Sequence, residues 1–418
     1  MEEKKSALLV SVYHSTEEKK HCEEYLDELE RLCDTCGLAV AKKVPCSLKK
    51  FDAGTYLGKG KLDELFQLSQ EAEVDLIIFD DEISPRQQKN LEAFFKKSVI
   101  DRTELILEVF AQRAQTREAR LQIELAKVKY QIPRLKRLWT HLSRQRTGGG
   151  GHLKGEGEKQ IEIDRRLLRH RIVQLEEELD LVCRQRTVQR SARLRSGIPT
   201  FAIVGYTNVG KSTLLKALTQ ADVFVEDKLF ATLDTTTRKF MLPNRQEVLL
   251  IDTVGFIRKI PHTLVAAFKG TLEEAVHTDI LLHLIDVSHP QAEEQAEATH
   301  EVLKELNATQ QPIITVLNKI DACQDLSLVD RLRIKYPKTV QISALKKIGF
   351  DQLAEMMIQE LSKLRKKVSL RIPQSHYALI SEIMRSARVI SSDYEENDVL
   401  LEAEIPQQME HKITQFII

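Results

Sequence analysis

The sequence predicts an α/β protein in which strands and helices alternate in two regions and a long helical hairpin separates them. Residues 1–100 and 198–366 alternate short apolar runs with amphipathic stretches, a pattern typical of helices packed on a mostly parallel sheet. A glycine-rich loop directly follows the apolar run Phe201–Val204. Between these regions, residues 101–197 repeat apolar positions every three or four residues, as helical seams do.

The first 100 residues are expected to form a small α/β subdomain. Its helix over 84–96 opens at Ser84-Pro85, where a capping hydroxyl precedes a proline at the first helical position. We expect strands at Ala7–Val12, Leu38–Ala41, Leu76–Phe79 and Ser98–Ile100, and helices over about 16–36, 60–71 and 84–96.

Residues 101–197 are expected to form an antiparallel helical hairpin. Pro133 should kink the first helix, and the second helix should run from about Glu158 to Arg195. Six glycines among residues 148–157 would form a flexible tip between them. One seam comprises Leu121, Leu125, Val128, Ile132, Leu135, Leu138 and Leu142, and the other comprises Leu168, Ile172, Leu175, Leu179 and Val182.

Charge is distributed unevenly, although the formal net charge of the chain is zero. Residues 131–171 contain eleven Lys and Arg against four Asp and Glu, whereas residues 367–418 contain five bases against eight acids. The basic excess at the far end of the hairpin predicts a local anion-binding face, since Lys and Arg make sequence-independent phosphate contacts. A solvated linker between two helices is the alternative interpretation.

The remaining chain is divided at Ser196-Gly197-Ile198-Pro199, which is typical of a boundary. Residues 198–366 are expected to form a second α/β domain and residues 367–418 a small α+β domain. In the latter we expect strands at Val368–Ile372, about Val389–Ser391 and Asp398–Ala403, and helices at Gln374–Arg388 and Gln407–Ile417.

The loop after Val204 has the pattern G-x-x-x-x-G-K-S of a phosphate-binding loop. Its amide groups and the following helix N-terminus would point at negative charge. Lys211 should reach the β- and γ-phosphates and Ser212 should bind Mg²⁺. The loop consists of Gly205, Tyr206, Thr207, Asn208, Val209, Gly210, Lys211 and Ser212. A nucleoside triphosphate is therefore the expected ligand, and a chance glycine-rich turn is the alternative.

Three further motifs favour guanine over adenine. Asp252-Thr253-Val254-Gly255 follows a buried strand and would face Mg²⁺ and the γ-phosphate. Asn318-Lys319-Ile320-Asp321 follows another strand, and the Asp321 carboxylate can accept from two guanine N–H groups that adenine lacks. Ser343-Ala344-Leu345 would contact the base through its backbone. This order and spacing predict a Ras-like P-loop G domain that binds GTP; a kinase-like protein or an ATPase is the alternative.

Hydrolysis is expected to need outside help. Ras-like enzymes usually place a glutamine after D-x-x-G to orient the attacking water, but here Phe256 follows Gly255. A phenylalanine side chain cannot orient water, so intrinsic hydrolysis should be slow. The water-activating residue is unknown from the sequence, and Lys211, Thr232 and Gly255 are the expected contacts of the transition state and the switches.

Several segments resemble the translational GTPase family HflX. They are Phe230-Ala231-Thr232-Leu233-Asp234 with Thr235-Thr236-Thr237-Arg238; Gly155-x-Gly157-Glu158-x-Gln160-x-Glu162-x-Asp164-Arg165-Arg166; Gly58-Lys59-Gly60-Lys61; and Phe79-Asp80-Asp81-Glu82-Ile83-Ser84-Pro85-Arg86-Gln87. The resemblance implies that Thr232 binds Mg²⁺ beside Ser212 and closes over the γ-phosphate. From the residues alone Thr235, Thr236 and Thr237 compete for that role.

The resemblance also implies a partner, the 50S ribosomal subunit. Members of the family bind it with the hairpin loop near the peptidyl-transferase region of 23S rRNA and split stalled 70S particles, so hydrolysis would be ribosome-stimulated and would release the protein. Relatives often carry GPGET where this chain has Gly155-Glu156-Gly157-Glu158-Lys159. The expected rRNA contacts are Arg144, Arg146, Lys154, Lys159, Arg165 and Arg166.

Two alternatives to this function stay open. One is an rRNA-binding assembly or dormancy factor that uses GTP as a structural ligand; the other is a general signalling GTPase. A second nucleotide site at Gly58–Lys61 is less favoured than a turn that caps the helix from Leu62.

No apolar stretch approaches the roughly 20 residues of a membrane span, and no signal peptide is evident. Cys33-x-x-Cys36 has no second pair at zinc spacing, so buried thiols are favoured over a metal or redox site. We expect a cytoplasmic monomer, with peripheral membrane association as an alternative.

Overall fold

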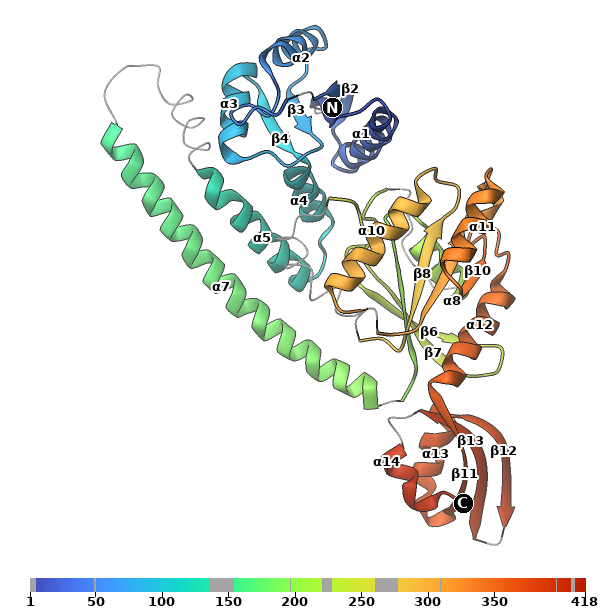
Figure 1. The fold of residues 1–418 in the computed structure, drawn as a ribbon. Coiled ribbons are helices and arrows are strands. Elements are labelled where there is room, and N and C mark those ends of the chain that lie inside the picture. Colours follow the sequence, from blue (N-terminus) through green and yellow to red (C-terminus); the bar gives the residue numbers. More distant parts are fainter. Residues whose placement is uncertain are drawn as a thin grey trace. The chain divides into compact units, whose positions relative to one another are not determined.

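The structure is a computed structural model of the 418-residue chain. It describes residues 5–48, 50–135, 154–195, 197–219, 228–259, 277–308, 310–395, 397–406 and 410–418 (Figure 1). These residues form two compact units, of which the first is built mainly from residues up to Asp180 and the second mainly from Leu181 onward. The predicted α/β class is confirmed in both.

The first unit begins with a four-stranded parallel sheet of order β2-β1-β3-β4. Its strands are β1 Ser6–Tyr13, β2 Ala39–Ser47, β3 Leu76–Phe79 and β4 Ser98–Asp101, and its helices are α1 Glu18–Thr35, α2 Lys59–Glu71 and α3 Pro85–Phe95. All four predicted strands and three predicted helices are present. The Ser84 hydroxyl accepts from Gln87 N, and the Gln87 side chain accepts from Ser84 N, so a capping box starts α3 as the Ser-Pro signal indicated.

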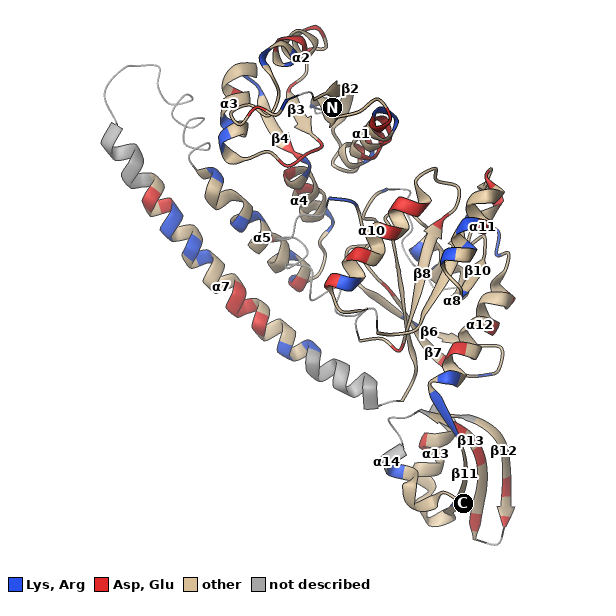
Figure 2. Ribbon diagram, in the orientation of Figure 1, with Lys and Arg blue, Asp and Glu red and all other residues tan. Residues whose placement is uncertain are grey.

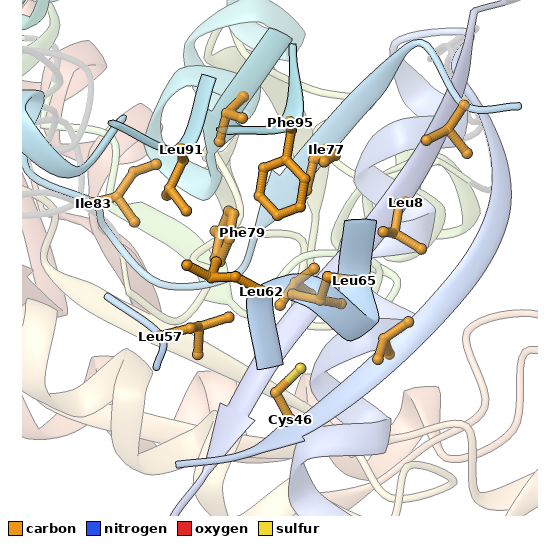
Figure 3. Close-up of a cluster of buried hydrophobic side chains, with 14 of the residues drawn as sticks. Leu8, Cys46, Leu57, Leu62, Leu65, Ile77, Phe79, Ile83, Leu91 and Phe95 are labelled. Carbon is orange, nitrogen blue, oxygen red and sulfur yellow. The ribbon is translucent and has the colours of Figure 1, made fainter. Parts of the chain in front are cut away.

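Apolar side chains from the strands and from the helices that cover them form a hydrophobic core (Figure 3). Leu8, Ile77 and Phe79 come from the strands, and they meet Leu65 of α2 and Phe95 of α3. Cys46, at the end of the edge strand β2, is buried among them, and burial raises the pKa of its thiol to about 12. Burial likewise raises the pKa of Cys33 to about 12, so this thiol is a core group and not a reactive one.

Helices follow the sheet in the first unit. They are α4 Arg102–Arg113, α5 Arg117–Gln131, the 3₁₀ turn η1 Ile132–Arg134 and the 42-residue α7 Lys154–Arg195, of which the residues from Leu181 onward belong to the second unit. Glu124 of α5 pairs with Arg171 of α7 at 2.7 Å, and Arg117 pairs with Glu178 at 3.2 Å, so the two helices run antiparallel. Leu175 is fully buried in the second seam. The predicted helical hairpin is confirmed, while Leu138 and Leu142 of the first seam lie outside the described residues.

Two details of the hairpin differ from the prediction. Helix α7 begins at Lys154 and not near Glu158, so Gly155 and Gly157 are helical instead of belonging to the loop. A long helix tolerates two glycines because each costs only about 1 kcal/mol relative to alanine and propagation is cooperative. Pro133 lies in the 3₁₀ turn that follows α5; the kink itself stays a prediction, because residues 136–153 lie outside the described residues.

A buried polar cluster joins the end of α5 to the sheet. Arg134, only 6% exposed, donates to the carbonyl of Ile83 at 2.8 Å, to Gln88 Oε1 at 3.1 Å and to Asp101 Oδ2 at 3.3 Å. Its guanidinium carbon lies 3.6 Å from the centre of the Tyr130 ring. Asp101, the last residue of β4, caps α4 through Glu104 N, so one cluster connects the end of α5 with the start of α4 and the end of β4.

The second unit contains a six-stranded sheet of order β10-β9-β8-β5-β7-β6. Its strands are β5 Thr200–Gly205, β6 Thr236–Met241, β7 Glu247–Asp252, β8 Ile280–Asp286, β9 Ile313–Asn318 and β10 Thr339–Gln341. Only β6 is antiparallel, paired with β7. Its described helices are α8 Lys211–Thr219, α10 Ala292–Glu305, η2 Ile320–Ala322, α11 Leu326–Lys335 and α12 Phe350–Lys363. This is the predicted Ras-like G-domain fold.

The chain ends in a three-stranded antiparallel sheet of order β11-β13-β12. Its elements are β11 Arg365–Pro373, η3 Gln374–His376, α13 Tyr377–Ser386, β12 Arg388–Glu395, β13 Asp398–Pro406, α14 Glu410–Ile413 and η5 Thr414–Phe416. The predicted α+β composition is confirmed, although β12 is longer than expected and the last helix is shorter. The exact division at 100, 197 and 366 stays a prediction. Within the described part of the chain, no helix has both the length and the apolar character that a bilayer span requires.

Candidate nucleotide-binding site

The phosphate-binding loop connects the end of β5 to the start of α8. Gly205 has φ of +153°, and a Cβ there would lie 2.5 Å from the carbonyl oxygen of Leu284 on β8. Gly210 has φ of +96°, and a Cβ there would lie 2.5 Å from the side-chain nitrogen of Asn318. Both glycines of the motif are therefore required by close approach of neighbouring strands and by backbone conformation.

Lys211 lies under this loop and is 6% exposed. Its ammonium donates to the carbonyl of Tyr206 at 2.7 Å and to that of Gly205 at 3.2 Å. Burial lowers the pKa of Lys211 to about 8, while the charge of Asp252 opposes that shift. The loop thus holds the Lys211 amino group beside its own carbonyl groups. Bound phosphate oxygens would raise the pKa of this group again, because they favour its charged form.

Three oxygen ligands meet at the start of α8. The Ser212 hydroxyl lies 2.7 Å from the Thr232 hydroxyl and donates to Asp252 Oδ2 at 2.7 Å. The other carboxylate oxygen of Asp252, Oδ1, is buried and has no hydrogen-bond partner among the described residues. Hydroxyl and carboxylate oxygens are the donors that Mg²⁺ prefers, and an orphaned carboxylate oxygen beside them suits a metal-bound water.

Thr232 is the threonine that the structure brings to Ser212. Thr236 and Thr237 begin the edge strand β6, where they pair with Asp252 and Ile251 of β7 through the backbone. The geometry thus favours Thr232 over Thr236 and Thr237 as the neighbour of Ser212, a role for which the sequence alone left all of them open.

The segment after Asp252 is joined to the phosphate-binding loop by backbone hydrogen bonds. Phe256 N donates to the carbonyl of Gly205 at 3.0 Å, and Thr207 N donates to the carbonyl of Phe256 at 2.7 Å. The Phe256 side chain is 1% exposed, so it packs in the interior. The hydroxyl of Tyr206, a residue of the predicted loop, accepts from Arg258 N at 2.8 Å.

Some motif residues support the fold around the site. The Thr253 hydroxyl donates to the carbonyl of Ile203 at 2.7 Å and thereby ties the end of β7 to β5. Val209, Leu233 and Val254 are buried. Phe230 itself belongs to the first unit, where its ring packs edge-on against that of Phe110 on α4, with ring centroids 4.5 Å apart.

Asn318 joins the phosphate-binding loop to the loop that carries Ala344. Its side-chain nitrogen donates to the carbonyl of Val209 at 2.8 Å, and its oxygen accepts from Ala344 N at 2.9 Å. Lys319 has a left-handed backbone, and its ammonium lies 2.7 Å from Asp286 Oδ2. Sequence analysis missed Asp286; its position as the last residue of the buried strand β8 is the signal that could have identified it.

Asp321 lies beside the loop that carries Ser343. A hydrogen bond to Ser343 and the Lys346 ammonium, 3.4 Å from Asp321 Oδ2, hold the pKa of this carboxyl below its usual range. Asp321 is therefore ionised and able to accept hydrogen bonds at neutral pH. Ser343 and Ala344 are buried, whereas the Leu345 side chain is exposed.

Comparison with known proteins agrees with this geometry. Residues 23–111 match the family described as GTP-binding GTPase N-terminal, residues 113–193 match GTP-binding GTPase Middle Region, and residues 200–319 match 50S ribosome-binding GTPase. A protein of Chlamydia pneumoniae named GTPase HflX is 48% identical over 414 residues, which span 98% of this chain and 88% of that protein. This chain belongs to the GTPase HflX family.

A second protein named GTPase HflX and one solved structure are also similar to this chain. GTPase HflX of Escherichia coli (strain K12) is 40% identical over 403 residues, covering 96% of this chain and 93% of the relative. A crystal structure of SsGBP in complex with GDP is 29% identical, covers 86% of this chain and 99% of that chain, and has a TM-score of 0.48. As a member of the HflX family, the chain is a GTP-binding GTPase.

The expected rRNA contacts are described only in part. Arg144 and Arg146 lie outside the described residues, and for Lys154 and Lys159 the structure describes the helical backbone alone. Arg166 is exposed on α7 and Arg165 is half-buried. Basic and acidic residues both occur along the described part of this helix (Figure 2).

Proposed function

We propose that this HflX-family GTPase associates with the 50S ribosomal subunit, splits stalled 70S ribosomes, and is released when GTP is hydrolysed. The observation that carries the proposal is the meeting of Ser212, Thr232 and Asp252. Thr232 belongs to the segment that resembles switch I of the family, and its hydroxyl lies 2.7 Å from that of Ser212. A switch segment held at the phosphate end of the site can report whether a γ-phosphate is present.

Mg²⁺ is the proposed metal. Ser212 and Thr232 would bind it directly, and Asp252 would hold one of its waters through the orphaned Oδ1. The ion would neutralise charge on the β- and γ-phosphate oxygens, while Lys211 holds the same phosphates from the loop.

Binding to rRNA is proposed for the arm formed by the helical hairpin. Arg144, Arg146, Lys154, Lys159, Arg165 and Arg166 would contact phosphates near the peptidyl-transferase region. Because such contacts release counterions, binding should weaken steeply with salt. We further propose that the protein is a cytoplasmic monomer and keeps the four-part division at residues 100, 197 and 366.

Sedimentation with ribosomal particles tests the proposal. Wild-type protein is centrifuged with 50S and with 70S particles in GDP or in a non-hydrolysable GTP analogue. We expect nucleotide-dependent binding to 50S and loss of the 70S peak with the analogue. Binding that ignores the nucleotide would favour an assembly or dormancy factor with structural GTP, and no ribosome binding would favour a signalling GTPase.

A charge-reversal pair tests the arm. Arg165→Glu with Arg166→Glu should weaken 50S binding without changing GDP affinity. Arg184→Glu, at an exposed position on the same helix, is the matched control and should bind as wild type does. If the double variant binds 50S subunits as well as Arg184→Glu does, Arg165 and Arg166 do not contact rRNA.

A further inference from the structure

One buried polar atom in the site has no assigned role. Thr207 is only 6% exposed, and its hydroxyl oxygen is fully buried. This oxygen has no hydrogen-bond partner among the described residues. An unsatisfied buried hydroxyl costs free energy, so its presence needs an explanation. The proposed metal-bound water explains the unpartnered Asp252 Oδ1, but nothing so far explains Thr207 Oγ1.

The surroundings of Gly255 locate the Thr207 side chain. A Cβ at Gly255 would lie 2.8 Å from the Lys211 ammonium, 2.8 Å from Thr207 Cα and 2.9 Å from Thr207 Cγ2. The Thr207 side chain and the Lys211 ammonium therefore border the same small space. Lys211 and the glycine of D-x-x-G are the groups that meet the γ-phosphate in GTPases of this type, so Thr207 lies at the γ-phosphate end of the site.

Among the hydrogen-bond donors of Thr207 and Phe256, the Thr207 hydroxyl is the one that can still form a hydrogen bond to a ligand. The amide of Thr207 is already used by the carbonyl of Phe256, and the amide of Phe256 is used by Gly205. The Phe256 ring is buried and has no polar atom. A hydroxyl, in contrast, can donate one hydrogen bond and accept two.

We propose that the Thr207 hydroxyl donates a hydrogen bond to a γ-phosphate oxygen and accepts one from the attacking water. In the reaction the water oxygen forms a bond to the γ-phosphorus, the bond from that phosphorus to the bridging β,γ-oxygen breaks, and the water proton passes to a γ-phosphate oxygen. Thr207 is unchanged at the end and acts as a catalytic residue that orients the nucleophile. This inference rests on the proposed function, because it assigns a group to the same hydrolysis.

Single-turnover GTP hydrolysis by full-length protein tests the inference, with and without 50S subunits. Thr207→Val keeps the shape of the side chain and removes the hydroxyl, and it should lower the rate about tenfold to hundredfold. Thr207→Ser restores the hydroxyl and should stay within about threefold of wild type, a rescue that a purely structural role would not predict. GDP affinity should change less than about threefold, since GDP lacks the γ-phosphate to which the hydroxyl is proposed to donate.

A matched control separates loss of this hydroxyl from loss of any buried hydroxyl. Thr299 on α10 is fully buried, and its hydroxyl is satisfied by the carbonyl of Gln295. Thr299→Val should hydrolyse GTP at the wild-type rate.

Three results would overturn the inference: wild-type hydrolysis by Thr207→Val, an equal loss in Thr207→Ser, or a parallel loss of GDP affinity. Failure of the proposed function appears separately, as a wild-type rate that 50S subunits do not change. In that case the intrinsic rates of the variants still decide the role of Thr207.

Discussion

Asn318 donates from its side-chain amide to the carbonyl of Val209, 2.8 Å away, and so connects the expected base pocket to the phosphate-binding loop. The same side chain accepts from Ala344 N at 2.9 Å. One amide group therefore braces both the loop under the phosphates and the loop beside the base. Residues 109 positions apart in the chain are coupled by it, which makes the two halves of the nucleotide site interdependent.

Removal of this brace should weaken GTP and GDP alike. Asn318→Ala deletes two buried hydrogen bonds, each contributing about 0.5–1.5 kcal/mol, so we expect affinity for both nucleotides to fall about tenfold or more. Gly210→Ala should also impair binding, because its Cβ would meet the Asn318 side-chain nitrogen. In the double variant that clash is gone, and the losses should be less than additive. Titration with a fluorescent GDP measures all four proteins; strictly additive losses would contradict the coupling.

Nucleotide affinity should depend on the protonation of Lys211. The pKa of about 8 in the free protein should rise when phosphates bind, because they favour the charged form. Binding then takes up a proton at alkaline pH, so GDP affinity should fall about tenfold between pH 7.5 and pH 9. Lys211→Arg, which cannot lose its proton in this range, should show a flat profile at whatever affinity it retains. A flat wild-type profile would contradict the low pKa.

Acid stability should depend on His283, which is fully buried on β8 and has neither ring nitrogen hydrogen-bonded to a described residue. Burial, with smaller contributions from His300 and Lys211, lowers its pKa to about 3 from 6.5. The folded state therefore binds fewer protons than the unfolded state between these values. Stability contributed by neutral His283 is complete above pH 6.5 and declines below it by about 1.4 kcal/mol per pH unit toward pH 3.

His283→Phe should remove that decline. The ring fills a similar volume without two unsatisfied nitrogen atoms, so urea unfolding at pH 7.5 and pH 5 should differ less than in wild type. His170→Gln, at an exposed position on α7, is the control and should keep the wild-type difference. An unchanged pH dependence in His283→Phe would show that other groups cause the acid sensitivity.

Arg134 should matter for the stability of the first unit. Its side chain pairs with Asp101, which is fully buried, so Arg134→Met would leave a carboxylate without its cation. Breaking a buried pair in this way costs about 3–5 kcal/mol. Burial already raises the pKa of Asp101, and loss of Arg134 should raise it further, so the deficit should shrink at pH 5 relative to wild type.

The double variant Asp101→Asn with Arg134→Met is the matched control for that pair. It carries no buried charge at either position and should be more stable than Arg134→Met alone. Unfolding followed by circular dichroism measures these proteins. A double variant that is less stable by the sum of the single effects would argue against a coupled pair.

Much of the G domain could be predicted because its motifs stand directly after buried strands. Parallel strands such as β5 and β9 are continuous apolar runs, and the loops at their carboxyl ends bring distant motifs together. The resemblance to HflX pointed to Thr232, but the residues alone left Thr235, Thr236 and Thr237 open. In the structure the Thr232 hydroxyl lies next to that of Ser212, whereas Thr236 and Thr237 start β6. The distance between two hydroxyl groups cannot be read from a sequence.

Some element bounds and one contact were not predicted, for local physical reasons. Strand β2 continues through Pro45, which is tolerated because β2 is an edge strand. Two glycines near Lys154 indicated a loop, yet they lie in a 42-residue helix whose cooperativity outweighs their low propensity. The contact between Asp286 and Lys319 joins the ends of two strands, and its partners could be paired only once the strand order was known.

Helix α7 has a mechanical consequence. Its 42 residues form one uninterrupted rod about 63 Å long at 1.5 Å per residue. For a rod of that length, a tilt of about 5° at one end displaces the other by about 5 Å, roughly the pitch of one helical turn. A helix with these dimensions would therefore convert a small change of angle at one end into a displacement of several ångströms at the other.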